Sequence, residues 1–205
     1  LEYLIREYKV DGFRFDLTKG FMGTSSNVDG YNQERVNYLK EYAAHIRYVD
    51  ANAVMICEHF VDSENYELSK EGIKVWRNMN HSYTKAQKRD MSQADFTGVT
   101  NSYNGDSGMM NDWQHFGNLV GFMESHDEQR TNYEAQWSYD GSVIPFATRI
   151  ARAKANAAFF LLVPGPKMIW QFGEIGYDIS IEDNGRTGKK PCKTAEYMGV
   201  PDRKA

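Results

Sequence analysis

Apolar residues along the chain follow two different spacings. In some segments they recur every three or four positions, as in Val36, Leu39, Ala43 and Ile46, which is the spacing of one face of an α-helix. In others they run without interruption, as over residues 53–57, which is typical of a strand buried on both faces. The two spacings predict helices over residues 1–8, 36–46, 62–71, 81–90 and 145–162, and strands over residues 9–16, 53–58, 73–78, 119–124 and 167–170. Polar stretches over residues 20–30, 91–117, 128–143 and 176–205 are predicted to be loops.

The order of these elements indicates the fold class. A first helix is followed by four strand–helix pairs and a last strand, and such alternation is typical of an α/β protein with a parallel sheet. No glycine fingerprint follows the first strand, so a dinucleotide-binding fold is disfavoured. Asp62 or Ser63 is expected to cap the third helix, and Pro145 to occupy the first position of the last one.

Charged side chains fall at the ends of the predicted strands. Asp16 and Glu58 end two of them, and His126 with Asp127 follows a third. The carboxyl ends of parallel strands are where the catalytic groups of β/α barrels gather. Arg14 lies two positions before Asp16, on the same face of the strand, where its positive charge favours the ionised aspartate.

Carboxylates that meet at one rim suit the cleavage of glycosidic bonds. A retaining glycosidase uses one carboxylate as nucleophile and one carboxylic acid as proton donor, about 5–5.5 Å apart. Two other interpretations use the same residues. Asp16 with Arg14 could be a structural ion pair, and Glu58, His59, His126 and Asp127 could bind zinc or manganese in a metal-dependent hydrolase.

Composition narrows the function classes further. The 205 residues carry a formal net charge of −4, and the pI near 5.8 argues against a nucleic-acid partner. The longest apolar run, residues 157–163, is too short to span a membrane. The cysteines Cys57 and Cys192 make neither a disulfide framework nor a four-ligand zinc site, and Cys57 is expected to be a packed strand residue.

Four segments resemble the sequence motifs of the α-amylase family, glycoside hydrolase family 13. They occur in the order in which the family carries them, and the resemblance covers about residues 1–190. The segments are DGFRFDLTK (11–19), similar to the fourth-strand motif; VMICE (54–58), similar to the fifth; FMESHD (122–127), similar to the seventh; and GPKMIWQFGE (165–174), similar to the eighth.

The resemblance implies a role for each matching residue. Asp16 would attack the anomeric carbon, and Glu58 would act as the general acid and base. Asp127 and His126 would bind the sugar at the cleavage site. Arg14 would orient Asp16, and Lys19 would contact a sugar on the leaving-group side. The substrate would be a starch- or glycogen-like α-glucan, cleaved or transferred with retention, with no cofactor required and no catalytic metal.

The resemblance also sets expectations for the architecture. Residues 1–175 would form part of a (β/α)₈ TIM barrel, about strands four to eight, and residues 176–205 would be a loop-rich C-terminal segment of the same domain. The family's usual histidine after Lys19 is replaced by Gly20, which removes a side chain from the acceptor side. The third-strand motif is not found, and with it much of the usual calcium site, so structural calcium is expected only in a longer parent protein. Family habit suggests a secreted or periplasmic location.

Two further hypotheses concern the chain by itself. Five strands cannot close an eight-stranded barrel, so the chain could be an inactive barrel fragment or a glucan binder that self-associates through open sheet edges. Tyr133, Trp137 and Tyr139 follow the seventh-strand motif, where they could stack on sugar rings or simply pack the loop.

Overall fold

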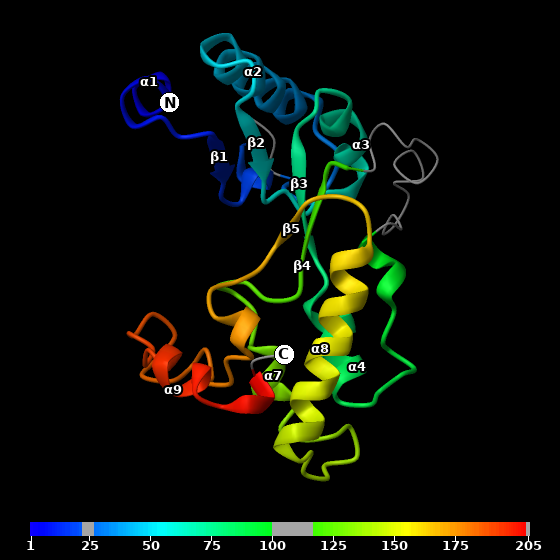
Figure 1. Ribbon diagram of the computed structural model, residues 1–205. Coiled ribbons are helices and arrows are strands. Elements are labelled where there is room, and N and C mark those ends of the chain that lie inside the picture. The colour runs from blue at the N-terminus through cyan, green and yellow to red at the C-terminus, as the bar shows by residue number, and fades with distance from the viewer. Residues whose placement is uncertain (22–26, 100–116, 204–205) are drawn as a thin grey trace. The chain divides into compact units, whose positions relative to one another are not determined.

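The computed structural model describes residues 1–21, 27–99 and 117–203 (Figure 1). The strands are β1 (Gly12–Phe15), β2 (Val54–Cys57), β3 (Lys74–Asn78), β4 (Leu119–Phe122) and β5 (Lys167–Met168). The α-helices are α1 (Glu2–Tyr8), α2 (Gln33–Val49), α3 (Asp62–Lys70), α4 (Asn80–Gln87), α7 (Thr131–Glu134), α8 (Phe146–Leu162) and α9 (Thr194–Met198). Short 3₁₀ turns are η1 (Thr18–Gly20), η2 (Phe96–Val99), η3 (Gly173–Ile175) and η4 (Pro201–Arg203).

The strands follow one another in the sheet in the order β1-β2-β3-β4-β5. β1 with β2, β2 with β3, and β4 with β5 pair in parallel. A doubly wound sheet would reverse its strand order at a switch point, whereas sequential parallel neighbours are the arrangement of a β/α barrel. The predicted α/β class with a parallel sheet is therefore confirmed.

The chain divides into two compact units. The first contains residues 1–77 and 100–120, and the second contains residues 78–99 and 121–205. The predicted boundary at residue 175 stays a prediction. Within the described ranges, no helix is both long and apolar enough to cross a membrane.

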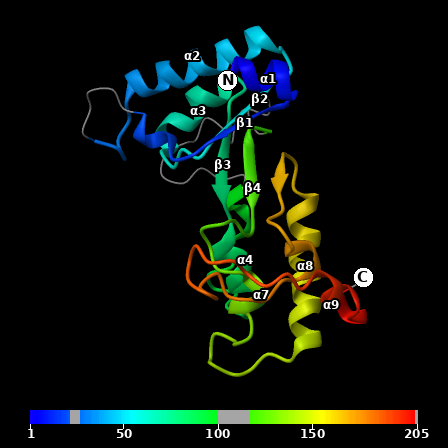
Figure 2. The ribbon, with the colours of Figure 1, turned by 90° about the vertical axis from the view of Figure 1, so that its left-hand side faces the viewer.

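The core of the first unit lies between its strands and helices. Helices α2 and α3 lie side by side (Figure 2). The apolar stripe of α2 is buried as its spacing predicts, with Val36, Leu39, Ala43 and Ile46 at most 1% exposed. These side chains pack on Met55 and other strand residues. Burial of this stripe against the sheet holds α2 in place.

Helix ends in the first unit follow capping chemistry only in part. Asn32 caps α2, because its side-chain oxygen accepts the N–H groups of Glu34 and Arg35. The prediction that Asp62 or Ser63 caps α3 is wrong, since Val61 holds that position and no side chain caps the helix.

The second unit packs α8 against α4 and α7. Its apolar contacts centre on Met79, Tyr83 and Phe160. Pro145 precedes α8 as its N-cap residue, one position earlier than predicted. The segment over 128–143, predicted to be loop, contains α7 and a bridge between Trp137 and Val143.

One C-terminal prediction also needs correction. The strand predicted over residues 167–170 is limited to Lys167 and Met168. The segment after residue 176 contains the short helix α9 and the turn η4, with most other residues in turns and irregular structure. Part of the loop predicted over 91–117 lies outside the described residues.

Candidate active site

Arg14 contacts two carboxylates at the end of the first unit's sheet. Its Nη1 lies 2.9 Å from Asp16 Oδ1, and its Nη2 lies 3.0 Å from Glu58 Oε2. The guanidinium also lies over the Trp76 indole, 4.8 Å from the ring centroid. The arginine is therefore fixed by two charges and one aromatic face, and it joins the two carboxylates predicted to act in catalysis.

The two carboxylates have different surroundings. The parallel register pairs Phe15 with Cys57, so the residues that follow them, Asp16 and Glu58, leave neighbouring strand ends together. The Asp16 side chain is 73% exposed, whereas that of Glu58 is 7% exposed. Leu17, in the left-handed backbone region at φ 41°, donates its N–H to Glu58 Oε2 at 2.9 Å. One carboxylate thus faces solvent, and the other is enclosed and held by a backbone donor.

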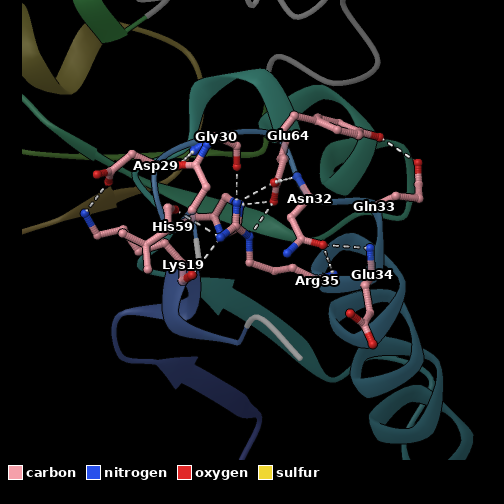
Figure 3. A network of polar contacts seen from close by, with 12 residues as sticks. Lys19, Asp29, Gly30, Asn32, Gln33, Glu34, Arg35, His59 and Glu64 are labelled. Carbon is pink, nitrogen blue, oxygen red and sulfur yellow. Dashed lines mark hydrogen bonds and ion pairs between the residues drawn. The ribbon is translucent and has the colours of Figure 1, made fainter. Parts of the chain in front are cut away.

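A network of polar side chains, with His59, Glu64 and Arg35 at its centre, lies next to these residues in the first unit; Figure 3 shows the contacts of these three side chains. The Thr18 hydroxyl lies 3.0 Å from His59 Nδ1, and His59 Nε2 lies 2.8 Å from Glu64 Oε2. Arg35 donates from Nε to Glu64 Oε2 at 2.9 Å and from Nη2 to Glu64 Oε1 at 2.5 Å. Burial alone raises the pKa of Glu64, but hydrogen bonds from His59, Arg35 and the Asn32 N–H hold it below its ordinary value.

Lys19 lies on the turn next to this network. Its Nζ lies 2.9 Å from Asp29 Oδ1, and its backbone oxygen accepts a hydrogen bond from Arg35 at 2.7 Å. Lys19 thus lies three positions after Asp16 in the chain, and Arg35 holds its backbone. Its contact with a sugar stays a prediction.

Cys57 takes no part in these contacts as a charged group. It is fully buried in β2, and burial raises the pKa of its thiol to about 12 against an opposing hydrogen bond from Thr18. Its expected role as a packed strand residue is consistent with this burial.

His126 and Asp127 follow β4 in the second unit and contact each other. His126 Nε2 lies 3.3 Å from Asp127 Oδ2. Arg186 donates from Nη2 to the Asp127 backbone oxygen at 2.6 Å and to its Oδ1 at 3.4 Å. The His126 ring lies 5.9 Å from the Trp170 indole, centroid to centroid. A basic and an aromatic side chain thus accompany the predicted pair.

A pocket of about 280 Å³ opens beside His126. Aromatic side chains (Trp170, Phe172, Tyr177) and basic ones (Arg130, Arg186, Lys190) contribute to its lining. Arg130 is itself held by a 3.0 Å ion pair with Glu124 and lies 5.0 Å from the Tyr177 ring centroid. Aromatic faces and fixed polar groups in one hollow suit the binding of a sugar, which presents both apolar ring faces and hydroxyl groups.

The aromatic residues of the loop after β4 pack locally. Tyr133 and Trp137 meet edge to face at 6.2 Å, and the Tyr139 N–H donates to the Lys88 oxygen at the end of α4. None of the three lines the pocket beside His126. These contacts account for the residues as loop packing, and sugar stacking by them stays a prediction.

The predicted site residues therefore form two clusters. Arg14, Asp16 and Glu58 lie together in the first unit, and His126 and Asp127 lie together in the second. Sequence reasoning did not single out several partners of these clusters: Arg35, Glu64, Trp76, Trp170 and Arg186. Arg35 carried a usable signal, because it stands four positions before Leu39 and so lies within the apolar stripe of α2.

The described part of the chain contains no group of three or more histidine, cysteine or acidic side chains that could hold a metal ion. The residues of the metal hypothesis have other contacts: His59 binds Glu64 and Thr18, and Glu58 binds Arg14 and Leu17.

A parallel α/β sheet of sequential strands, with charged side chains beyond the strand ends, is the arrangement of a β/α-barrel domain. The family model of the α-amylase catalytic domain matches residues 1–203, and the chain belongs to the α-amylase family, glycoside hydrolase family 13. Its five strands correspond to part of the family's (β/α)₈ barrel, about strands four to eight. No curated protein sequence matches the chain.

Solved structures of low sequence identity share the fold. Apo pullulanase from Klebsiella pneumoniae has a TM-score of 0.62 at 14% identity, with 90% of this chain and 25% of that one covered. Pullulanase from Bacillus acidopullulyticus has a TM-score of 0.59 at 18% identity, with 95% and 25% covered. An α-amylase from H. orenii has a TM-score of 0.55 at 18% identity, with 86% and 33% covered. The chain thus spans a quarter to a third of these proteins.

Proposed function

We propose that the protein containing this chain cleaves or transfers α-glucosidic bonds in starch- or glycogen-like glucans, with retention of configuration. The proposal rests on family membership and on one observation above others, the Arg14 guanidinium that bridges an exposed Asp16 and an enclosed Glu58. The similar solved proteins, pullulanases and an α-amylase, agree with this substrate class.

In the first step, Asp16 attacks the anomeric carbon while the bond from that carbon to the leaving oxygen breaks. Glu58 gives its proton to the leaving oxygen, so the departing sugar leaves as a neutral alcohol. Arg14 orients the attacking carboxylate of Asp16 and also holds the Glu58 carboxyl through its ion pair with Oε2. The exposed position of Asp16 suits a nucleophile that must reach a bound sugar.

In the second step, Glu58 takes a proton from water or from a sugar hydroxyl, which attacks the glycosyl-enzyme and releases Asp16. His126 and Asp127 bind sugar hydroxyls, and Asp127 favours the distorted, oxocarbenium-like ring. The aromatic lining of the pocket beside His126 is a reason to assign sugar binding to this pair.

The nucleophile and the acid/base are tested by Asp16→Asn and Glu58→Gln in the intact protein. Each change keeps the size of the side chain but removes the chemistry. We expect kcat on soluble starch to fall by at least about 10²- to 10⁴-fold in each variant, the contribution typical of a positioned acid or base. Circular dichroism checks that the variants fold, and starch turnover by a folded variant at the wild-type rate would contradict the assignment.

Retention and the choice of acceptor need separate measurements. Proton NMR during the first minutes of reaction shows whether the α-anomer forms first, as a covalent glycosyl-enzyme requires. Chromatography of the products of maltoheptaose then separates hydrolysis, which gives only shorter chains, from transfer, which also gives longer ones. A β-anomer as first product would overturn the two-step mechanism.

A further inference from the structure

Four buried side chains form a chain of contacts that begins at the Glu58 backbone and ends at the backbone of Lys19, Val28 and Gly30. Thr18 contacts His59, His59 contacts Glu64, and Glu64 contacts Arg35. Each of the four residues is 0% exposed. Figure 3 shows His59 and Arg35 meeting at the Glu64 carboxylate. The sequence motifs explain none of these contacts, and the proposed mechanism does not use them.

The contact between His59 and Glu64 has a defined hydrogen-bond direction. Glu64 is ionised and accepts from Arg35 and from the Asn32 N–H, so His59 Nε2 must carry the proton that it shares with Glu64. On the other side of the ring, His59 Nδ1 lies 3.0 Å from the Thr18 hydroxyl. Glu64 therefore fixes the ring of His59, and the ring fixes the Thr18 side chain.

Thr18 touches Glu58 directly. Its N–H donates to the Glu58 backbone oxygen at 2.8 Å, and its hydroxyl lies 3.1 Å from the same atom. The preceding residue, Leu17, donates its N–H to the Glu58 carboxylate, and Glu58 donates its own N–H to Phe15. Residues 15–18 thus hold both the backbone and the carboxylate of Glu58, and the orientation of this turn depends on Thr18.

Arg35 extends the same network to the backbone around Lys19. It donates to the backbone oxygens of Lys19 and Gly30 at 2.7 Å each and to that of Val28 at 3.0 Å. A buried ion pair used only for stability is often replaceable by apolar side chains of the same volume. Here one carboxylate, Glu64, contacts both His59, which lies against Thr18, and Arg35, which holds the backbone oxygens of Lys19, Val28 and Gly30.

We propose that Thr18 and His59 are positioning residues for the acid/base Glu58, held in place by Glu64 and Arg35. This inference rests on the proposed function. Proton donation to a leaving oxygen requires the donor to stay within hydrogen-bond reach of it. Loosening the side-chain contacts of Thr18 lets the Glu58 carboxyl drift, whereas the nucleophile Asp16 directly follows β1 and is held by Arg14 of that strand.

The test compares two substrates of the intact protein that differ in their need for an acid. Maltoheptaose has a leaving oxygen that must be protonated, whereas α-maltosyl fluoride has a leaving group that departs without a proton. The kcat/KM value reports the first step in both cases. Thr18→Val removes the hydroxyl at almost constant volume. It is expected to lower kcat/KM on maltoheptaose by about 10- to 100-fold and to leave the fluoride value nearly unchanged.

Two variants serve as controls. Thr18→Ser restores the hydroxyl and should restore the maltoheptaose value. Thr84→Val removes a second buried threonine hydroxyl, which has no hydrogen-bond partner among the described residues, and should change neither substrate. Thermal unfolding shows whether Thr18→Val is folded at the assay temperature. If it is not, His59→Gln, which can keep the contact with Glu64 but not that with Thr18, gives the same comparison.

Glu58→Gln separates the failure of this inference from that of the proposed function. It should show the largest loss on maltoheptaose with little loss on the fluoride. If Glu58→Gln behaves in this way and Thr18→Val lowers both substrates equally, or neither, Thr18 is only structural and the inference is overturned. If Glu58→Gln turns over maltoheptaose at the wild-type rate, or the wild-type protein turns over neither substrate, the proposed function itself fails.

Discussion

At the scale of single residues, Arg14 organises the electrostatics of the candidate active site. It contacts an exposed and an enclosed carboxylate with two different nitrogens, and its guanidinium plane is covered by Trp76. Lysine has a single charged nitrogen and no flat face, so it could not make these three contacts together. The identity of this residue, and not only its charge, sets the relation between Asp16 and Glu58.

Glu64 allows a residue-scale prediction about pH. Its pKa is held below the ordinary value of 4.5, so in the unfolded chain it takes up a proton at higher pH than in the folded one. Its contribution to stability is complete above about pH 4.5 and is lost as the pH falls through the lower, folded value. Urea unfolding between pH 7 and pH 3 should therefore show stability falling on the acid side.

The Glu64→Gln variant should lose about 3–5 kcal/mol at pH 7, because the buried Arg35 keeps its charge without a charged partner. It should also lose stability less steeply than the wild type below pH 4.5. Glu67→Gln is the control on the same helix, because its ion pair with Lys70 lies at the surface and contributes at most about 1 kcal/mol. Equal acid slopes for Glu64→Gln and the wild type would contradict the prediction.

At the scale of elements, the contact between β1 and β2 determines where the two carboxylates stand. Gly12 pairs with Val54, and the Val54 N–H donates to the Asp11 oxygen at 2.9 Å. A Cβ at position 12 would lie 2.1 Å from the Val54 oxygen and 2.7 Å from its nitrogen. Both obstacles are backbone atoms, so only a glycine permits this close approach of the strands.

Gly12→Ala should therefore push β1 away from β2. We expect a loss of about 1–3 kcal/mol in the free energy of unfolding, together with a loss of starch turnover as Asp16 moves relative to Glu58. Gly20→Ala is the matched control for stability, since a Cβ there meets no atom within 4 Å. Urea unfolding of both variants measures the difference, and a Gly12→Ala variant as stable as Gly20→Ala would refute the role of the close approach.

Elements with a long apolar pattern could be predicted from sequence, and short ones could not. The stripe of α2 is buried as its spacing indicates, because repeated apolar positions leave only one way to face a core. The run of β2 is buried only at alternate positions, with Met55 and Cys57 buried and Val54 36% exposed, so the expected burial on both faces is wrong. The short helix α7 depends on tertiary contacts, since Thr131 donates its N–H and its hydroxyl to Glu124. No local pattern encodes such a contact.

In the candidate site, too, some residues could be predicted from local sequence patterns, and others depend on tertiary packing. Arg14, Asp16 and Glu58 could be predicted because neighbouring parallel strands deliver their ends to one edge. The pairing of Arg35 with Glu64 spans 29 positions in the sequence, and only the folded packing of α2 on α3 brings them together. Sequence could indicate that Arg35 is buried, but it could not name the partner.

At the scale of the whole molecule, each of the two units has its own apolar core and carries one of the two residue clusters. The groups proposed to act in catalysis and sugar binding sit on separate segments of the chain, beyond separate strands. This is the general construction of β/α-barrel enzymes, in which the loops after several strands share the chemistry. If the proposed roles hold, a substitution near His126 is expected to change sugar binding without changing the contacts of Arg14, Asp16 and Glu58.

Two exposed surfaces are expected to make this chain associate in solution when it is produced alone. Among the described strands, β1 pairs with β2 only, so its other edge presents unpaired backbone groups. In the second unit, Phe159, Leu161 and Leu162 near the end of α8 are 55–83% exposed. We expect the chain of 23.6 kDa to associate, with a mass that rises with concentration in light scattering after size exclusion.

Two substitutions on α8 test the part played by its apolar end. Leu162→Lys should lower the association, because it places a charge on the apolar surface, whereas the control Lys154→Arg on the same helix should leave it unchanged. A constant mass of 23.6 kDa at every concentration would show that the edge of β1 and the end of α8 are protected within the monomer.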